Sequence, residues 1–238
     1  MHFTLSGTVV ALALLAGSVT ALPAKQTPYT PAPNLDNLAK LMPKSDLPTP
    51  DGLQLKYVVL GMGTQNYTCL TDDENAAPGT TGAVAQLYDI GTALSKNPMA
   101  RWTIPSISPL ALSLWSQPAR FTQNLQSLGY EHMIGHHFFS GAAPTFALDQ
   151  LSMSPYPLTV LAKLAETSAP SSSCPGNNAE GAIKWLLLKD TKGLSQGGID
   201  TVYRVETAGG NKPTTCKGQQ KTFEVKYSAQ YWIFGPRT

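Results

Sequence analysis

The carboxy-terminal segment constrains the fold most, because its side chains alternate between two chemical classes. Two interleaved sets span residues 221–234: Phe223, Val225, Tyr227, Ala229, Tyr231 and Ile233, and between them Thr222, Glu224, Lys226, Ser228 and Gln230. In a β-strand, successive side chains point to opposite faces. The pattern therefore predicts a long strand with one face on a core and the other toward water.

The same period of two recurs along the chain between turn-rich segments. It begins at Leu53, and further strands are expected over residues 65–70, 83–90, 136–139, 157–165, 182–189 and 199–206. Short strands separated by Gly, Pro, Asn and Ser are typical of antiparallel folds. We expect an all-β fold, a mainly antiparallel β-sandwich or barrel.

One or two short helices interrupt this pattern. Over residues 118–128, Phe121, Leu125 and Leu128 share a helix face, and Gly129 follows as a stop signal. The preceding segment ISPLALSLW predicts a second helix.

The amino-terminal segment predicts secretion. Residues 5–19 carry no charge, and Val19-Thr20-Ala21 places small residues where a signal peptidase cleaves. We expect a signal peptide over 1–21 and a secreted, extracellular product, because the apolar run is too short for a membrane span. Residues 22–52 are rich in proline and predict an arm on the domain surface, and residues 53–238 predict a single β domain.

The charge content excludes two classes of protein. Only 13% of residues are charged, and the 17 basic and 15 acidic side chains are scattered without a basic run. A disordered chain combines low hydrophobicity with high net charge, and a nucleic-acid-binding protein usually carries a basic stripe. Neither describes this chain, and we expect no nucleic-acid partner.

Secretion gives meaning to the three cysteines, Cys69, Cys174 and Cys216. An oxidising compartment favours one disulfide and one remaining thiol, and the residues alone leave all three pairings open. Asn66-Tyr67-Thr68 is a glycosylation sequon, so a glycan is expected on Asn66.

Two glycine motifs resemble known catalytic or cofactor-binding signatures, but neither is followed by the helix that its signature requires. Leu60-Gly61-Met62-Gly63 begins like a dinucleotide-binding fingerprint but lacks the third glycine and the following helix, which favours a hairpin turn. The sequence therefore predicts no cofactor and does not support a nicotinamide-dependent dehydrogenase. Ser195 lies in a G-x-S-x-G motif, but a strand pattern follows and no histidine comes later, so a polar loop is expected.

Polar clusters supply the candidate metal ligands. His132, His136 and His137 lie within six residues, but Gly135 interrupts any helix between them. In a strand, His136 and His137 would point to opposite sides, which favours a buried, hydrogen-bonded imidazole over a metal site. The acidic run 72–74 lacks the spacing of a calcium loop and indicates a solvated turn.

Four tryptophans, Trp102, Trp115, Trp185 and Trp232, accompany the strands. Exposed rings on a sheet could stack on the sugars of a wall polysaccharide, whereas buried rings would serve packing. Trp185, within GAIKWLLLKD, is expected in the core.

Six segments together indicate a family: LKYVVLGMGTQNYTC, GAVAQLYDIG, GHHFF, GAIKWLLLKD, VYRVETAGGNKPTTC and VKYSAQYWIFG. From about Leu53 to Phe234 the chain resembles a secreted family of fungi and bacteria known only as a domain of unknown function, whose fungal members are often labelled malate dehydrogenase. The resemblance implies a Cys69–Cys216 disulfide, with Cys174 as the odd thiol, and an insert at residues 99–131. It brings no catalytic mechanism.

Three functions follow as hypotheses. The first is a non-catalytic extracellular binding module for a wall polysaccharide or another surface. The second is an extracellular enzyme, metal-assisted in one version, with a site near residues 135–137 and 204–210, where His137 and Arg204 are the candidate ligand-binding residues. The third is a structural wall protein.

Overall fold

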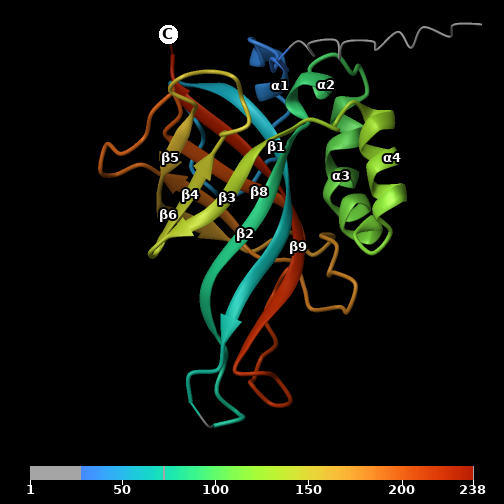
Figure 1. The fold of residues 1–238 in the computed structure, drawn as a ribbon, viewed down its shortest axis with the longest axis vertical. Helices are drawn as coiled ribbons and strands as arrows, with labels where there is room; N and C mark the ends of the chain where they lie inside the picture. The colour runs from blue at the N-terminus through green and yellow to red at the C-terminus, as the bar shows by residue number, and fades with distance from the viewer. Residues whose placement is uncertain (1–27, 72, 238) are drawn as a thin grey trace, which may run out of the picture.

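The computed structural model describes residues 28–71 and 73–237 of the chain. The predicted signal peptide at 1–21 and the first residues of the predicted arm lie outside the described residues. Figure 1 shows a curved sheet with helices packed against one side of it.

The described part of the chain forms nine strands and four helices. The strands are β1 (Leu53–Thr68), β2 (Gly79–Asp89), β3 (Met133–Ser140), β4 (Ala143–Ala147), β5 (Leu158–Val160), β6 (Ala162–Thr167), β7 (Trp185–Lys189), β8 (Thr201–Gly209) and β9 (Thr222–Pro236). The helices are α1 (Asp36–Ala39), α2 (Gly91–Leu94), α3 (Ala100–Leu114) and α4 (Pro118–Leu128).

All nine strands belong to one antiparallel sheet that nearly closes into a barrel. The strand order is β5-β4-β3-β2-β1-β9-β8-β7-β6. The two edge strands, β5 and β6, are consecutive in the chain and only Leu161 separates them. The chain itself therefore joins the two edges of the sheet, which confirms the all-β prediction in its barrel form (Figure 1).

The alternation along β9 creates two cores, one on each face of the sheet. Ala229, Tyr231 and Ile233 belong to the core inside the barrel, and Trp232 and Phe234 belong to the core outside it. The polar set of the alternating pattern was expected to face water along the whole strand. That prediction is wrong for Ser228 and Gln230, which are both fully buried. At Gln230 the outer face is covered by α3, whose Ile104 carbonyl accepts a hydrogen bond from Gln230 Nε2 (2.6 Å).

Residues 99–131 contain the two expected helices. The helix predicted over residues 118–128 has those bounds in α4, and Gly129 follows it in the left-handed region (φ 70°). The second predicted helix is α3, which begins at Ala100, earlier than its apolar pattern indicates. Figure 1 shows α3 and α4 beside the outer face of the sheet.

The described part of the arm is a component of the outer core. Leu35, Leu38 and Leu47 are buried in it, and the Tyr203 hydroxyl on β8 donates a hydrogen bond to the Pro48 carbonyl (2.7 Å). The sheet presents an apolar outer face, and these leucines cover it.

The expected hairpin at Gly61 and Gly63 is wrong, because both glycines lie inside the continuous strand β1. A Cβ on Gly61 would lie 2.4 Å from Cε2 of Tyr231, and a Cβ on Gly63 would lie 1.8 Å from the Val84 carbonyl oxygen. The glycines therefore serve close packing inside a narrow barrel and do not form a turn.

Cys69 and Cys216 form a disulfide, as the family resemblance implied, and Cys174 is a free cysteine. The bond joins the loop after β1 to the loop before β9, where the Cys216 amide also donates to the Ala76 carbonyl (2.8 Å). Asn66 lies half-exposed on β1 nearby, and its glycosylation stays a prediction. Among the described residues, no helix is long and apolar enough to cross a membrane.

Candidate functional site

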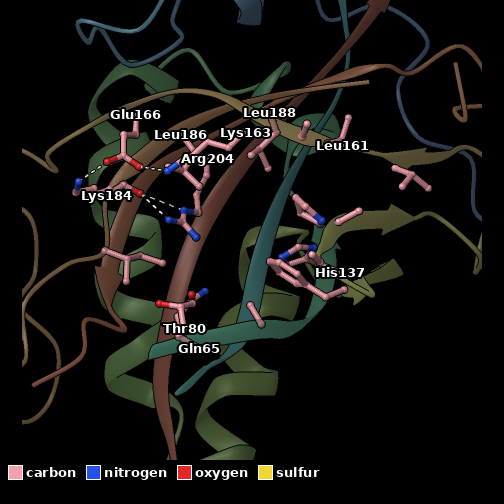
Figure 2. A pocket seen from close by; sticks show the side chains of 18 of the residues that line it. Gln65, Thr80, His137, Leu161, Lys163, Glu166, Lys184, Leu186, Leu188 and Arg204 are labelled. Carbon is pink, nitrogen blue, oxygen red and sulfur yellow. Dashed lines mark hydrogen bonds and ion pairs between the residues drawn. The ribbon is translucent and has the colours of Figure 1, made fainter. Parts of the chain in front are cut away.

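A pocket of about 920 Å³ opens into the barrel, a size typical of small-molecule sites. Side chains from both halves of the sheet line it (Figure 2). Its wall is largely apolar and includes Phe139, Val160, Leu161, Ile183, Leu186 and Leu188. Four polar or aromatic groups, Gln65, His137, Arg204 and Tyr231, also line it and are called here the polar cluster.

Arg204 reaches the pocket because of its register on β8. Its neighbours Tyr203 and Val205 belong to the outer core, so the side chain between them faces inward. Its Nε and Nη2 atoms donate to the Lys184 carbonyl at 3.1 and 2.9 Å, which orients the guanidinium. Among the described residues no carboxylate forms an ion pair with it.

His137 faces inward from β3 and is 4% exposed. Its ring stacks on Phe146 with centroids 4.2 Å apart, and Nδ1 lies 2.9 Å from the Thr145 carbonyl oxygen. A carbonyl only accepts, so Nδ1 carries the proton and Nε2 is left as an acceptor. Burial, with a smaller contribution from the Arg204 charge, lowers the pKa of His137 to about 4, so the ring is neutral at pH 7.

The tyrosines inside the barrel are neutral as well. Tyr227 and Tyr231 are fully buried on β9, and their hydroxyl oxygens lie 2.7 Å apart. Burial raises the pKa of both, although the nearby Arg204 charge opposes this. Near neutral pH, Arg204 is therefore the one charged member of the polar cluster.

Gln65 completes the polar cluster from the inner face of β1. Its side chain is 5% exposed, and its Nε2 has no hydrogen-bond partner. Figure 2 shows Gln65 and Arg204 directed from opposite sides into the same space, with His137 beside it. A buried donor without a partner costs about 1–3 kcal/mol, so an acceptor beside this atom would be stabilising.

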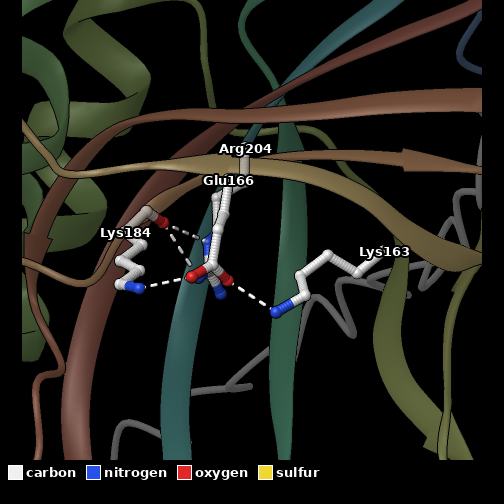
Figure 3. Close-up of polar contacts among 4 residues, drawn as sticks. All are labelled: Lys163, Glu166, Lys184 and Arg204. Atoms are coloured by element: carbon white, nitrogen blue, oxygen red, sulfur yellow. Dashed lines mark hydrogen bonds and ion pairs between the residues drawn. The ribbon is translucent and has the colours of Figure 1, made fainter.

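Basic side chains surround the pocket beyond the polar cluster. Lys163, Lys184, Lys192 and Lys212 line it together with one described acid, Glu166. Glu166 is engaged by Lys163 (Nζ–Oε2 2.5 Å) and by Lys184 through its other oxygen (Figure 3). These hydrogen bonds, Lys163 first, lower the pKa of Glu166 to about 2. The pocket thus keeps a positive charge balance.

The structure separates the three candidate histidines. His136 points away from the barrel interior and pairs with Asp149 (Nδ1–Oδ1 2.9 Å), whereas His137 points inward, as the strand pattern predicted. His132 stacks on Tyr29 with centroids 3.7 Å apart. Within residues 28–71 and 73–237, no three His, Cys, Asp or Glu side chains are grouped to hold a metal ion.

The remaining motif residues lie in loops. Ser195 is in the β7–β8 loop, as expected, and its hydroxyl lies 2.6 Å from that of Thr159. Asp73 and Glu74 are exposed in the β1–β2 loop, and Asp72 is outside the described residues.

The tryptophans do not form an exposed platform on the sheet. Trp185 and Trp232 are buried, which confirms the prediction for Trp185. Trp115 is half-buried under Lys226, and Trp102 on α3 is exposed.

Sequence reasoning found two members of the polar cluster, His137 and Arg204, and missed Gln65 and Tyr231 as site residues. The signal for Gln65 was its place in the period of two, on the same side of the strand as Tyr67. The alternation shows that Gln65 faces inward only once β1 is known to be one continuous strand.

The fold and the pocket define a β-barrel protein with an internal, positively charged pocket. The chain belongs to the family described as protein of unknown function (DUF3455), whose profile matches residues 49–235. This confirms the resemblance to a domain of unknown function. Comparison with curated proteins and with solved structures found no match.

The neutral state of His137 predicts a pH-dependent stability. Because folding lowers the pKa of this histidine from 6.5 to about 4, its contribution is complete above pH 6.5 and is lost as the pH falls through 4. Between pH 7 and pH 4.5 the wild type should lose about 2–3 kcal/mol more unfolding free energy than His137→Phe. Urea unfolding at both pH values measures this difference.

His132→Gln removes a half-buried imidazole outside the barrel and serves as the control for loss of a histidine as such. Equal pH slopes for the wild type and His137→Phe would contradict the buried, neutral state of His137.

Proposed function

We propose that this protein is a non-catalytic, secreted binding protein that takes up a small organic molecule inside its β-barrel. The observation that carries the proposal is the pocket of about 920 Å³, whose wall is mainly apolar and whose polar groups converge in one cluster. Pockets that combine a mainly apolar wall with a few polar groups bind small molecules by apolar contact and orient them through hydrogen bonds.

The protonation states favour binding over acid–base catalysis. A general base works best with a pKa near the working pH, whereas burial holds His137 at about 4 and raises the pKa of Tyr227 and Tyr231. At pH 7 these groups are fixed hydrogen-bonding partners. The hypothesis of an enzyme site near residues 135–137 and 204–210 is less well supported. A pocket lies there, but none of these groups has a pKa suited to a general base.

Secretion and glycosylation belong to the same proposal. The Cys69–Cys216 disulfide supports an oxidising compartment, in line with the signal peptide expected at 1–21. A small organic molecule replaces the wall polysaccharide of the sequence-based hypothesis, because two of the four tryptophans are buried and the pocket offers a more enclosed site.

A neutral fluorescent probe tests the pocket. N-phenyl-1-naphthylamine should bind the purified protein at a single saturable site. Ala143→Trp places a large ring at a half-buried position lining the pocket, and it should weaken probe binding at least about tenfold by occupying the space. Fluorescence titration measures both affinities.

Ala119→Trp, at an exposed position of α4, is the matched control and should leave the affinity unchanged. Absence of saturable binding by the wild type, or equal affinities for the two tryptophan variants, would refute a ligand site in the barrel.

A further inference from the structure

The guanidinium of Arg204 is held in place by a backbone carbonyl and not by any described acid. Its Nε and one Nη2 hydrogen are oriented by the Lys184 carbonyl, and it forms no ion pair with a described carboxylate. Arginine carries five N–H donors in a planar fork and keeps its charge in proteins. A partly enclosed cation of this kind is normally matched by an anion, and the described protein supplies none.

Gln65 supplies a second, independent observation. Gln65 lines the pocket, and its Nε2 is buried without an acceptor. Figure 2 places its amide and the Arg204 guanidinium on two sides of one space. An oxyanion in that space would accept from both groups and remove the cost of the unpaired donor.

The charge of the polar cluster indicates how many charges the ligand carries. His137, Tyr227 and Tyr231 are neutral, so the cluster carries the single positive charge of Arg204. One planar guanidinium beside one amide donor matches the two oxygens of a carboxylate. A phosphate dianion would require a second charge at this depth, whereas the lysines of the pocket are exposed, apart from half-buried Lys212.

The surroundings of the cluster indicate the rest of the ligand. Leu161, Ile183, Leu186 and Leu188 form an apolar wall beside it, which suits a hydrocarbon or ring body. The lysines Lys163, Lys184, Lys192 and Lys212 outnumber the one acid, Glu166, which two of them already neutralise. Such an excess of positive charge attracts anions toward the opening.

We propose that the ligand of the barrel is an amphipathic carboxylic acid, whose carboxylate is bound by Arg204 and Gln65 and whose apolar body lies on the wall of the pocket. His137 Nε2 is then available to accept a hydrogen bond from a hydroxyl of the ligand. The inference rests on the proposed binding function and names its ligand class.

Competition against the neutral probe tests the inference with three ligands of equal chain length. Decanoic acid should displace the probe from the wild type at least about tenfold more effectively than 1-decanol, because only the acid pairs with Arg204. Decyl phosphate should displace it less effectively than decanoic acid. Tighter binding of decyl phosphate would overturn the carboxylate assignment.

Arg204→Gln should lower the affinity for decanoic acid at least about tenfold. The affinities for 1-decanol and the probe should stay within about twofold of the wild-type values. Arg120→Gln removes the same charge from an exposed site on α4 and should change none of the three. Gln65→Met keeps the side-chain length without the amide, and it should weaken the binding of decanoic acid alone, several-fold. It tests the inference even if Arg204→Gln does not fold.

The outcomes separate the two proposals. A wild type that does not bind the probe refutes the barrel site itself. Probe binding with equal displacement by acid and alcohol, or with acid affinity unchanged in Arg204→Gln and Gln65→Met, refutes the carboxylate anchor and leaves the binding function standing.

Discussion

Loss of the Cys69–Cys216 disulfide should lower the free energy of unfolding by about 2–5 kcal/mol. The bond joins residues 147 positions apart, so it removes many conformations from the unfolded chain. It also holds together the loops after β1 and before β9, where the Cys69 amide donates to the Lys221 carbonyl at 2.9 Å. Denaturant unfolding of the wild type and of the Cys69→Ala, Cys216→Ala double variant measures the difference.

Cys174→Ala is the matched control. Its thiol is half-buried and free in the structure, so its removal should change stability by no more than about 0.5–1 kcal/mol. A reductant should lower the stability of the wild type toward that of the double variant. If the reductant and the double substitution both leave the midpoint unchanged, the disulfide does not stabilise the fold.

Sequence patterns predicted those elements that depend mainly on residues close together in the chain. The strand at β9 and the bounds and stop signal of α4 depend on neighbours along the chain, and these predictions are confirmed. The disulfide is different, because the residues left three pairings open and the resemblance to a family selected Cys69 with Cys216.

The unpredicted features depend on contacts between distant segments. Nothing near Gln230 in sequence indicates that α3 covers its face of β9. The prediction of a single strand over residues 157–165 also missed the break at Leu161, where the chain passes from one edge of the sheet to the other.

The candidate site was predicted in part for the same reason. The strand pattern showed that only one of His136 and His137 points inward, and it did not show which. Arg204 was named through the hypothesis of a site near residues 135–137 and 204–210. Gln65 gained its meaning only with the sheet order known, because β1 and β8 both flank β9 and turn Gln65 and Arg204 toward the same pocket (Figure 2).

Gly63→Ala should destabilise the protein by about 3 kcal/mol or more, because the new methyl group meets backbone that cannot move aside. Its Cβ would lie 1.8 Å from the Val84 carbonyl oxygen and 2.6 Å from the Ala85 Cα, both on β2. Gly79→Ala is the matched control in the same strand pair, where the nearest atoms are 3.6 Å away. Thermal and urea unfolding of both variants, followed by circular dichroism, measure the effect. Since the clash exists only if Gly63 pairs with Ala85, equal stability of the two variants would show that β1 and β2 pair in another register.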